Sequence, residues 1–266
     1  MVKKAWIGGN FGSKSSRGLV SERPEAAEAV DPVAFAREKL GFNPDENQIA
    51  MLRGGKRGIL NCSRQWGKST VAAAKAVHRA YSDPGSLTLL LTPSGRQSGE
   101  FMRKAKEFVR RLGIRVRGDG NNKSSIMLPN GSRIIGLPES AAKVRGFSNV
   151  SLLLFDEASR VTDETYRTMR PTLAASDGDL WLMSTPNGKR GFLYEEWAHG
   201  GPEWERILAT GPDCPRLKKR FLDEERAKSE RSFRQEYLCE FVEREGAAFS
   251  QESIDAAFQD FEPMKI

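Results

Sequence analysis

Short apolar runs alternate with amphipathic segments along the middle of the chain. Four runs, at 58–62, 87–92, 150–155 and 180–184, are rich in aliphatic residues and bounded by polar or helical stretches. Dense apolar runs of this length are typical of strands that are buried on both faces. The alternation therefore predicts an α/β fold, in which helices cover both faces of a mostly parallel sheet.

Helical patterns precede and separate these runs. The first begins at Asp31, whose carboxylate can cap the helix, with Pro32 at the first helical position, and it stops at Gly41. A second helix is predicted over 71–81. After Pro215 the pattern changes to charged helices, predicted over 220–229 and 231–242, which are too polar to form a core alone. We interpret these two as a small subdomain laid over the main sheet.

An insertion separates the second and third apolar runs. Strands are predicted at 114–117, 124–128 and 132–137. The sequence Pro129-Asn-Gly131 supplies the turn chemistry for a hairpin between the last two.

Composition excludes several classes of protein. At 38% hydrophobic and 29% charged residues, with no run of eighteen apolar residues, the chain has neither a membrane span nor a secretory signal. Cys62, Cys214 and Cys239 are widely separated, which argues against a disulfide framework or a zinc site. With only His78 and His199, a histidine-based metal site or catalytic triad is not expected.

Positive charge is concentrated in the centre of the chain. The formal net charge is +7, but residues 51–150 hold 19 basic and 5 acidic residues, a net charge of +14. This asymmetry points to a polyanionic partner, either a phosphate-rich ligand or nucleic acid. The alternative is that basic residues only cover solvated helix faces.

A phosphate-binding loop is predicted between the first apolar run and the helix at 71–81. Backbone N–H groups and a helix N-terminus can cradle phosphates in this layout. Lys68 would reach the β and γ phosphates of ATP, and Ser69 would ligate Mg²⁺. The usual pattern has glycine five residues before Gly67, where this chain has Cys62, so a surface loop with an incidental lysine remains the alternative. The candidate ATP-binding residues of the loop are Ser63, Arg64, Gln65, Trp66, Gly67, Lys68, Ser69 and Thr70.

Two adjacent carboxylates follow the run at 150–155. Asp156 and Glu157 lie at the carboxyl end of this predicted strand, where open α/β sheets bind their ligands. Asp156 would hold Mg²⁺ through water, and Glu157 would orient and deprotonate the attacking water. An acidic turn is the alternative for this motif alone, but the two motifs in this order favour nucleotide hydrolysis.

Two further motifs flank this pair. Upstream, Phe42 offers a ring for stacking and Gln48 an amide that can read an adenine edge, although a capped helix start with Phe42 in the core is an equally good interpretation. Downstream, Ser184 and Thr185 end the last apolar run before Pro186. They could sense the γ phosphate and pass its loss to neighbouring elements, or form an ordinary turn.

With these four motifs in this order, residues 42–249 resemble the ATPase domain of the large terminase subunit, the DNA-packaging motor of tailed bacteriophages. The loop from Cys62 to Ser69 is similar to that family's deviant Walker A motif, which tolerates loss of the first glycine and has an arginine where Arg64 stands. Residues 184–186 are similar to its coupling motif, and residues 235–241 to the segment that leads out of its ATPase domain.

The resemblance implies a RecA-like, ASCE-type P-loop ATPase with a small helical lid and with ATP and Mg²⁺ as cofactors. It also implies double-stranded DNA as substrate, a homo-oligomeric ring, a portal and a small terminase subunit as partners, and a location in the host cytoplasm and transiently on the procapsid. The expected domains are a flexible arm at 1–30, the ATPase core at 31–200, the lid at 201–245 and a linker at 246–266. The family's nuclease domain is not expected, since the residues after 249 are too few to form it, and we interpret the chain as a fragment.

Two arginines compete for the role of arginine finger. The resemblance places Arg145, just before the apolar run at 150–155, at the position of an arginine finger that acts on a neighbouring subunit's nucleotide. Arg64 is the candidate within its own subunit. A guanidinium suits either role because it can meet developing phosphoryl charge bidentately, and a structural ion pair is the alternative for Arg145.

A basic helix is predicted over 99–112, with its apolar residues on one face. Its cations can contact DNA phosphates, which is the kind of contact that a motor indifferent to sequence needs. The alternative is a solvated helix face. The candidate DNA-binding residues are Arg103, Lys104, Lys106, Arg110 and Arg111.

The primary hypothesis is an ATPase motor that translocates double-stranded DNA into a viral procapsid. One alternative is a superfamily 2 helicase-like translocase, which would need a second RecA-like domain that 266 residues do not accommodate. The other is a DNA- or ATP-binding assembly factor that hydrolyses nothing.

Overall fold

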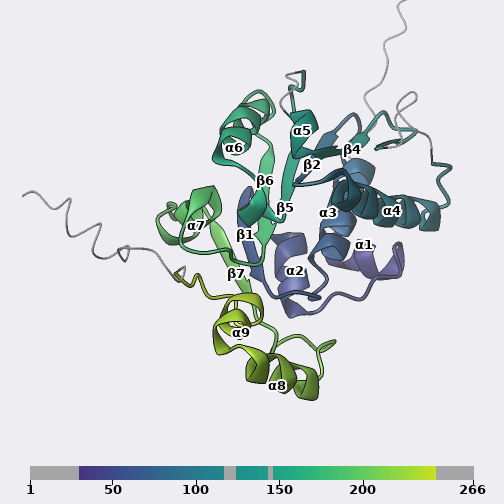
Figure 1. Cartoon of the computed structure of the whole chain (residues 1–266). Coiled ribbons are helices and arrows are strands. Elements are labelled where there is room, and N and C mark those ends of the chain that lie inside the picture. Colours follow the sequence, from purple (N-terminus) through teal and green to yellow (C-terminus); the bar gives the residue numbers. More distant parts are fainter. Residues whose placement is uncertain (1–29, 117–123, 143–145, 244–266) are drawn as a thin grey trace, which may run out of the picture.

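The sheet of the fold has seven strands and is parallel except at one edge (Figure 1). The computed structural model describes residues 30–116, 124–142 and 146–243. The strand order is β3-β4-β2-β5-β6-β1-β7, and only β3 and β4 pair antiparallel. The strands are β1 (Arg57–Cys62), β2 (Leu87–Thr92), β3 (Ser125–Met127), β4 (Arg133–Pro138), β5 (Leu152–Asp156), β6 (Asp179–Ser184) and β7 (Glu205–Ala209).

Helices join the strands and cover the sheet. They are α1 (Pro32–Glu38), α2 (Glu46–Arg53), α3 (Lys68–Ser82), α4 (Gly95–Arg111), α5 (Glu139–Ala142), α6 (Asp163–Met169), α7 (Gly191–Ala198), α8 (Lys219–Lys228) and α9 (Glu230–Glu236), with short 3₁₀ helices η1 (Ala158–Arg160) and η2 (Arg170–Leu173).

Two separate hydrophobic clusters show that both faces of the sheet are covered. One cluster contains residues of the helices α1, α2, α3 and α4 together with strand residues such as Leu60, Leu90 and Leu154. The other joins α6 and α7 to strand residues of the opposite side, such as Ile59 and Leu153. Neighbouring residues of a strand fall into different clusters because successive side chains point to opposite faces. This explains why the central strands are apolar throughout, and it confirms the predicted α/β fold.

The four predicted core strands are confirmed within one or two residues, and so is the antiparallel hairpin of β3 and β4. The strand predicted at 114–117 is wrong for its described part, because residues 114–116 form no strand. The sequence reading also missed β7, an edge strand whose Ile207 and Ala209 are buried while Leu208 is exposed. Such a short strand, buried on one face only, gives a weak pattern.

Helix ends agree less closely with expectation. Asp31 caps α1 by accepting from the Ala34 N–H, with Pro32 first in the helix, as predicted. The basic helix begins at Gly95 rather than 99, because Ser94 caps it. The last predicted helix ends at Glu236 rather than 242.

The lid differs in position from the prediction. Helices α8 and α9 share a small cluster of their own and lie together beyond the end of the sheet, not over one of its faces (Figure 1). Asn61, at the end of β1, donates to the Cys239 carbonyl at 2.9 Å. Strand β7 falls inside the range predicted for the lid, yet it belongs to the sheet, so the helical part of the lid starts after it. The predicted arm at 1–30 and linker at 246–266 lie almost wholly outside the described residues.

Candidate functional site: a phosphate-binding loop at the carboxyl ends of three strands

Three of the predicted motifs converge where neighbouring strands of the sheet end. Strands β5, β6 and β1 are neighbours and parallel, so their carboxyl ends meet. The loop at 63–67 follows β1, Asp156 and Glu157 end β5, and Ser184 and Thr185 end β6. The topology therefore assembles a site from segments that are about 90 and 30 residues apart in sequence.

The loop after β1 has the backbone that a phosphate cradle requires. Gly67 has φ +105°, and a Cβ added there would lie 3.2 Å from the Gln48 side-chain nitrogen, so the position needs glycine. Trp66 is 1% exposed and anchors the loop in the core. Cys62, by contrast, lies in regular β-strand with a fully buried side chain, and burial raises its pKa to about 12. Because the backbone here is regular strand, this position does not require glycine.

The chemical centre of the site consists of two contacts between the loop helix and β5. The Lys68 ammonium lies 2.7 Å from a Glu157 carboxylate oxygen. The Ser69 hydroxyl donates to an Asp156 carboxylate oxygen at 2.9 Å. The two adjacent carboxylates thus point to different partners, because Asp156 ends β5 whereas Glu157 adopts a left-handed φ of +54° as the chain leaves the strand.

Charge compensation dominates this centre. Burial alone would lower the pKa of Lys68, but the Asp156 and Glu157 carboxylates outweigh it and raise that pKa. Burial raises the pKa of Asp156, the Lys68 ammonium opposes this shift, and the Glu157 charge adds to it. One ammonium therefore faces two carboxylates, an arrangement that can accept a divalent cation.

Arg64 lies on the rim of this centre and is held by the lid. It lines a pocket of about 300 Å³ together with Lys68, Gln97 and Glu157. Its guanidinium is 2.5 Å from a Glu236 carboxylate oxygen of α9, and its backbone N–H donates to the Glu236 carbonyl at 3.2 Å. The side chain is 56% exposed, so it can swing into the pocket.

Of the two interpretations that the sequence left open for the upstream motif, the capped helix start with Phe42 at the core is confirmed. Gln48 is 2% exposed and forms a capping box with Asp45, while Phe42 packs against the core cluster, 6.1 Å from the ring of Phe108. The free end of the Gln48 amide nevertheless lies beside Gly67 of the loop. Helix capping therefore fixes an amide next to the phosphate-binding turn.

The Ser184-Thr185 segment touches both other motifs. The Thr185 hydroxyl donates to the Cys62 carbonyl at 2.9 Å, and the Ser184 hydroxyl donates to the Ser159 hydroxyl at 2.8 Å, just after Glu157. Ser184 and Thr185 are 0% and 6% exposed. A displacement of either partner strand end would be transmitted to this segment directly.

The predicted DNA-binding cations do not form one uniform surface. Arg103 pairs with Glu100 at 2.7 Å, and Arg111 pairs with Glu107 at 2.6 Å. Arg110 is exposed, and Lys104 and Lys106 are half-buried. Arg145 lies outside the described residues.

Sequence reasoning missed three residues of this region. Glu236 holds Arg64, as described above. Arg216 donates to the Trp66 carbonyl and pairs with Asp45 at 2.8 Å, which links the segment before α8 to the loop. Lys75, 7% exposed, donates to the carbonyls of Met51, Leu52 and Gly54 at the end of α2. All three are separated from their partners by 20 or more residues, and no local pattern predicts these contacts, although Glu236 lies in the segment at 235–241 that resembles the family.

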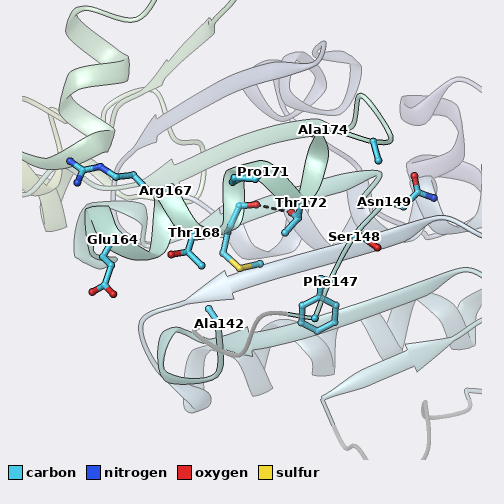
Figure 2. A pocket seen from close by; sticks show the side chains of 13 residues that line it. Ala142, Phe147, Ser148, Asn149, Glu164, Arg167, Thr168, Pro171, Thr172 and Ala174 are labelled. Carbon is cyan, nitrogen blue, oxygen red and sulfur yellow. Dashed lines mark hydrogen bonds between the residues drawn. The ribbon is translucent and has the colours of Figure 1, made fainter.

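A larger pocket, of about 630 Å³, lies elsewhere, beside residues 146–149 and along α6 and η2 (Figure 2). Phe147 and Pro171 contribute to its walls, with Glu164 and Arg167 near one end (Figure 2). None of the predicted site residues that the structure describes lines it. Pocket size alone therefore does not identify the site of chemistry here.

A metal-binding cluster and a membrane-spanning helix are both absent from residues 30–116, 124–142 and 146–243. No cluster of three or more His, Cys, Asp or Glu side chains suited to a metal ion is present among these residues. Within the same ranges, every helix is too short or too polar to cross a membrane.

Known proteins similar to this chain share one family. The model of the family described as "terminase large subunit, T4likevirus-type, N-terminal" matches residues 59–256. The large terminase subunits of Thermus phage G20c and Thermus virus P23-45 are each 26% identical over 251 residues, which cover 80% of this chain and 52% of theirs. The chain thus spans about half the length of the curated relatives it matches.

Solved structures agree in fold. The ATPase domain of the Thermus phage P74-26 large terminase has a TM-score of 0.71 at 24% identity, covering 80% of this chain and all of that one. The large terminase of bacteriophage HK97 has a TM-score of 0.67 at 17% identity, covering 80% of this chain and 55% of that one. The RecA-like ATPase fold is therefore shared, and the match over 59–256 shows that this chain belongs to the terminase large-subunit family.

Proposed function

We propose that the chain is the ATP-hydrolysing motor domain of a viral large terminase and that it translocates double-stranded DNA into a procapsid. The observation that carries this is the pair of contacts Lys68–Glu157 and Ser69–Asp156, which joins the phosphate-binding loop to two carboxylates at the end of β5. Family membership supports the choice of motor. In addition, the large terminase of a thermophilic bacteriophage, 14% identical, was solved in complex with ADP.

The residues of the site divide the work of hydrolysis. Lys68 binds the terminal phosphates, and its release from Glu157 frees that carboxylate to orient and deprotonate water. Gly67 and the start of α3 supply backbone N–H groups to the phosphates. In this proposal the amide of Gln48, which lies beside Gly67, reads the adenine edge.

Mg²⁺ fits the donors present. The Ser69 hydroxyl and the Asp156 carboxylate already lie within hydrogen-bonding distance, so both can contribute oxygen to one ion. Because Mg²⁺ usually keeps several waters and binds substrate phosphates, two protein groups are enough. The ion would neutralise phosphate charge during transfer.

Two arginines remain candidates for stabilising the transition state. Arg64 can act in its own subunit after leaving Glu236, and Arg145 can act on the nucleotide of the next subunit in a homo-oligomeric ring. Ser184 and Thr185 would pass the loss of the γ phosphate to β1 and to the segment after Glu157, which they contact.

The remaining parts of the motor are proposed from the family. A portal and a small terminase subunit are the expected partners in the host cytoplasm and on the procapsid. The α4 cations are the candidate contacts for DNA phosphates. Of these, Arg103 and Arg111 already pair with glutamates of their own helix, which leaves Arg110 as the most exposed candidate.

Phosphate release measured with and without duplex DNA tests the proposal. We expect Mg²⁺-dependent ATP hydrolysis that duplex DNA stimulates, without strand separation. Strand separation would instead favour the helicase-like translocase. ATP binding with no phosphate release under any condition would favour the non-hydrolysing assembly factor and overturn the proposal.

A further inference from the structure

A second recess opens on the other side of the loop helix. It measures about 260 Å³ and is lined by Gly41, Phe42, Thr70 and a stripe of α4. Thr70 lies two residues after Lys68, which lines the first pocket of about 300 Å³. The two recesses therefore flank a single turn of α3, one beside Glu157 and the other beside the Phe42 ring.

One face of α4 lines both recesses. Gln97 belongs to the first pocket and Lys104 to the second. A separation of seven residues places them on the same side of the helix, roughly 10 Å apart along its axis. Glu107 and Arg111 continue this stripe, and the adjoining side of α4, with Phe101 and Ala105, is buried in the core. The helix thus follows the direction in which an extended nucleotide would lie.

Lys104 is the cation of this stripe that is available to a ligand. Arg103 pairs with Glu100, and Arg111 pairs with Glu107 and donates to the Leu40 carbonyl at 2.6 Å. In the described part of the chain Lys104 forms no ion pair, and it is half-buried in the wall of the recess. An ammonium in this position can donate up to three hydrogen bonds to oxygen or nitrogen acceptors.

The shape of the recess argues against DNA as the ligand of Lys104. A hollow of this volume, with an aromatic ring on one wall, has room for a base and a sugar. A duplex presents its phosphates on a convex surface and needs cations that protrude, as Arg110 does on the exposed side of the same helix.

We propose that this recess holds the nucleoside end of the bound nucleoside triphosphate and that Lys104 binds the sugar or the base, not DNA. The inference rests on the proposed function, because the phosphates must occupy the loop at Lys68. It adds a residue of α4 to the nucleotide site and removes that residue from the candidate DNA surface.

Calorimetric titration of the full chain with ATP, ADP and inorganic tripolyphosphate tests this. For Lys104→Ala we expect the affinities for ATP and ADP to fall together by about fivefold to tenfold, the effect of losing one hydrogen bond of ordinary net strength. Tripolyphosphate, which lacks a nucleoside, should bind as before. Lys104→Arg should retain most of the affinity, and Lys39→Ala, which removes an exposed charge from the end of α1, should change nothing.

Duplex DNA binding supplies the opposing measurement. Lys104→Ala should leave the DNA affinity and its salt slope unchanged, whereas Arg110→Ala should lower both if α4 contacts DNA at all. The inference is overturned if Lys104→Ala weakens DNA binding and spares ATP, or if it weakens tripolyphosphate as much as ATP. A wild-type chain that binds ATP without hydrolysing it would overturn the proposed function and leave this inference standing.

Discussion

Lys68 and Lys75 lie two turns apart on α3, and both are largely buried, yet their surroundings are opposite. Lys68 faces two carboxylates, and its ammonium lies 2.7 Å from Glu157. Lys75 meets three backbone carbonyls at the end of α2 and lies 4.8 Å from the centre of the Trp181 ring. The same side chain on the same helix is therefore an ion-pair partner in one turn and a helix cap in another.

Their acidities differ accordingly. The carboxylates raise the pKa of Lys68 despite its burial. Burial lowers the pKa of Lys75 to about 8, with Asp179 and Glu205 opposing the shift and Arg79 adding to it. A full opposite charge compensates desolvation, whereas carbonyl dipoles compensate only part of it. The first turn of α3 is thus prepared to exchange carboxylates for phosphates, and the third turn fixes α2, which carries Gln48.

The largest expected effect comes from removing the acidic partner of Lys68. In Glu157→Gln the amide keeps the shape but cannot take a proton, so we expect kcat for ATP to fall by about 10²- to 10⁴-fold. ATP binding should persist, because Lys68 and the loop are intact. Phosphate release at saturating ATP, together with calorimetric binding, measures both quantities.

The matched control is Glu224→Gln, an exposed carboxylate on α8 that pairs with Arg220. It should leave turnover at the wild-type level. Substantial hydrolysis by Glu157→Gln would show that another group activates the water.

Removing the cation of Lys68 should instead weaken the binding of ATP. Lys68→Met leaves Asp156 and Glu157 buried without their counter-charge and takes away the principal phosphate contact. We expect the affinity for ATP to fall by about 2–5 kcal/mol, the cost of breaking a buried hydrogen-bonded charge pair. Lys228→Met, which breaks an exposed pair with Glu225, should leave it unchanged. ATP affinity equal to wild type in Lys68→Met would contradict the role assigned to the loop.

The two lysines also show what a sequence can and cannot reveal. Lys68 is recognisable because its chemistry depends on neighbours in the chain, Gly67 and Ser69, and on a β-strand that ends in two acids. Lys75 lies in an alanine-rich helical stretch and is buried only because α2 packs over it. Local motifs fix the catalytic centre, whereas contacts made by the packing of distant segments leave no periodic signal.

The elements of the fold also divide into those that local sequence predicts and those that depend on distant contacts. Strands buried on both faces were predicted to within two residues, because nearly every position of such a strand is apolar. The edge strand β7 and the position of the lid were not, since both depend on which side of β1 the chain returns to after α7. Arg216 and Glu236, which bind the loop from that returning segment, were missed for the same reason.

Lys75 should make the free energy of unfolding depend on pH. Its pKa is about 8 in the folded chain, whereas the ordinary pKa of a lysine is 10.5, so between these pH values the unfolded state holds the extra proton. The free energy of unfolding should therefore gain from Lys75 as pH rises from about 8 to 10.5, by an amount on the order of 3 kcal/mol at most.

Lys75→Met should lack this gain. Because Cys62 and Cys239 have raised pKa values and oppose the trend above pH 9, the quantity to measure is the difference between the wild-type and Lys75→Met curves from urea unfolding at pH 7 to 10.5. The exposed Lys228→Met variant should run parallel to wild type. If this difference does not change with pH, burial does not lower the pKa of Lys75 in the folded chain.

The smallest effect is expected at the link between the loop and the segment before α8. Arg216 donates to the Trp66 carbonyl, and because the peptide is planar and trans, the Gly67 N–H is directed away from Arg216. Its side chain is 43% exposed, so Arg216→Ala should cost about 1 kcal/mol, a roughly fivefold rise in the KM for ATP with kcat little changed. Arg220→Ala, with a side chain 91% exposed, is the matched control and should leave KM at the wild-type value. A fall in kcat at constant KM would instead place Arg216 in the transition state, and would make the segment before α8 a third source of the arginine finger beside Arg64 and Arg145.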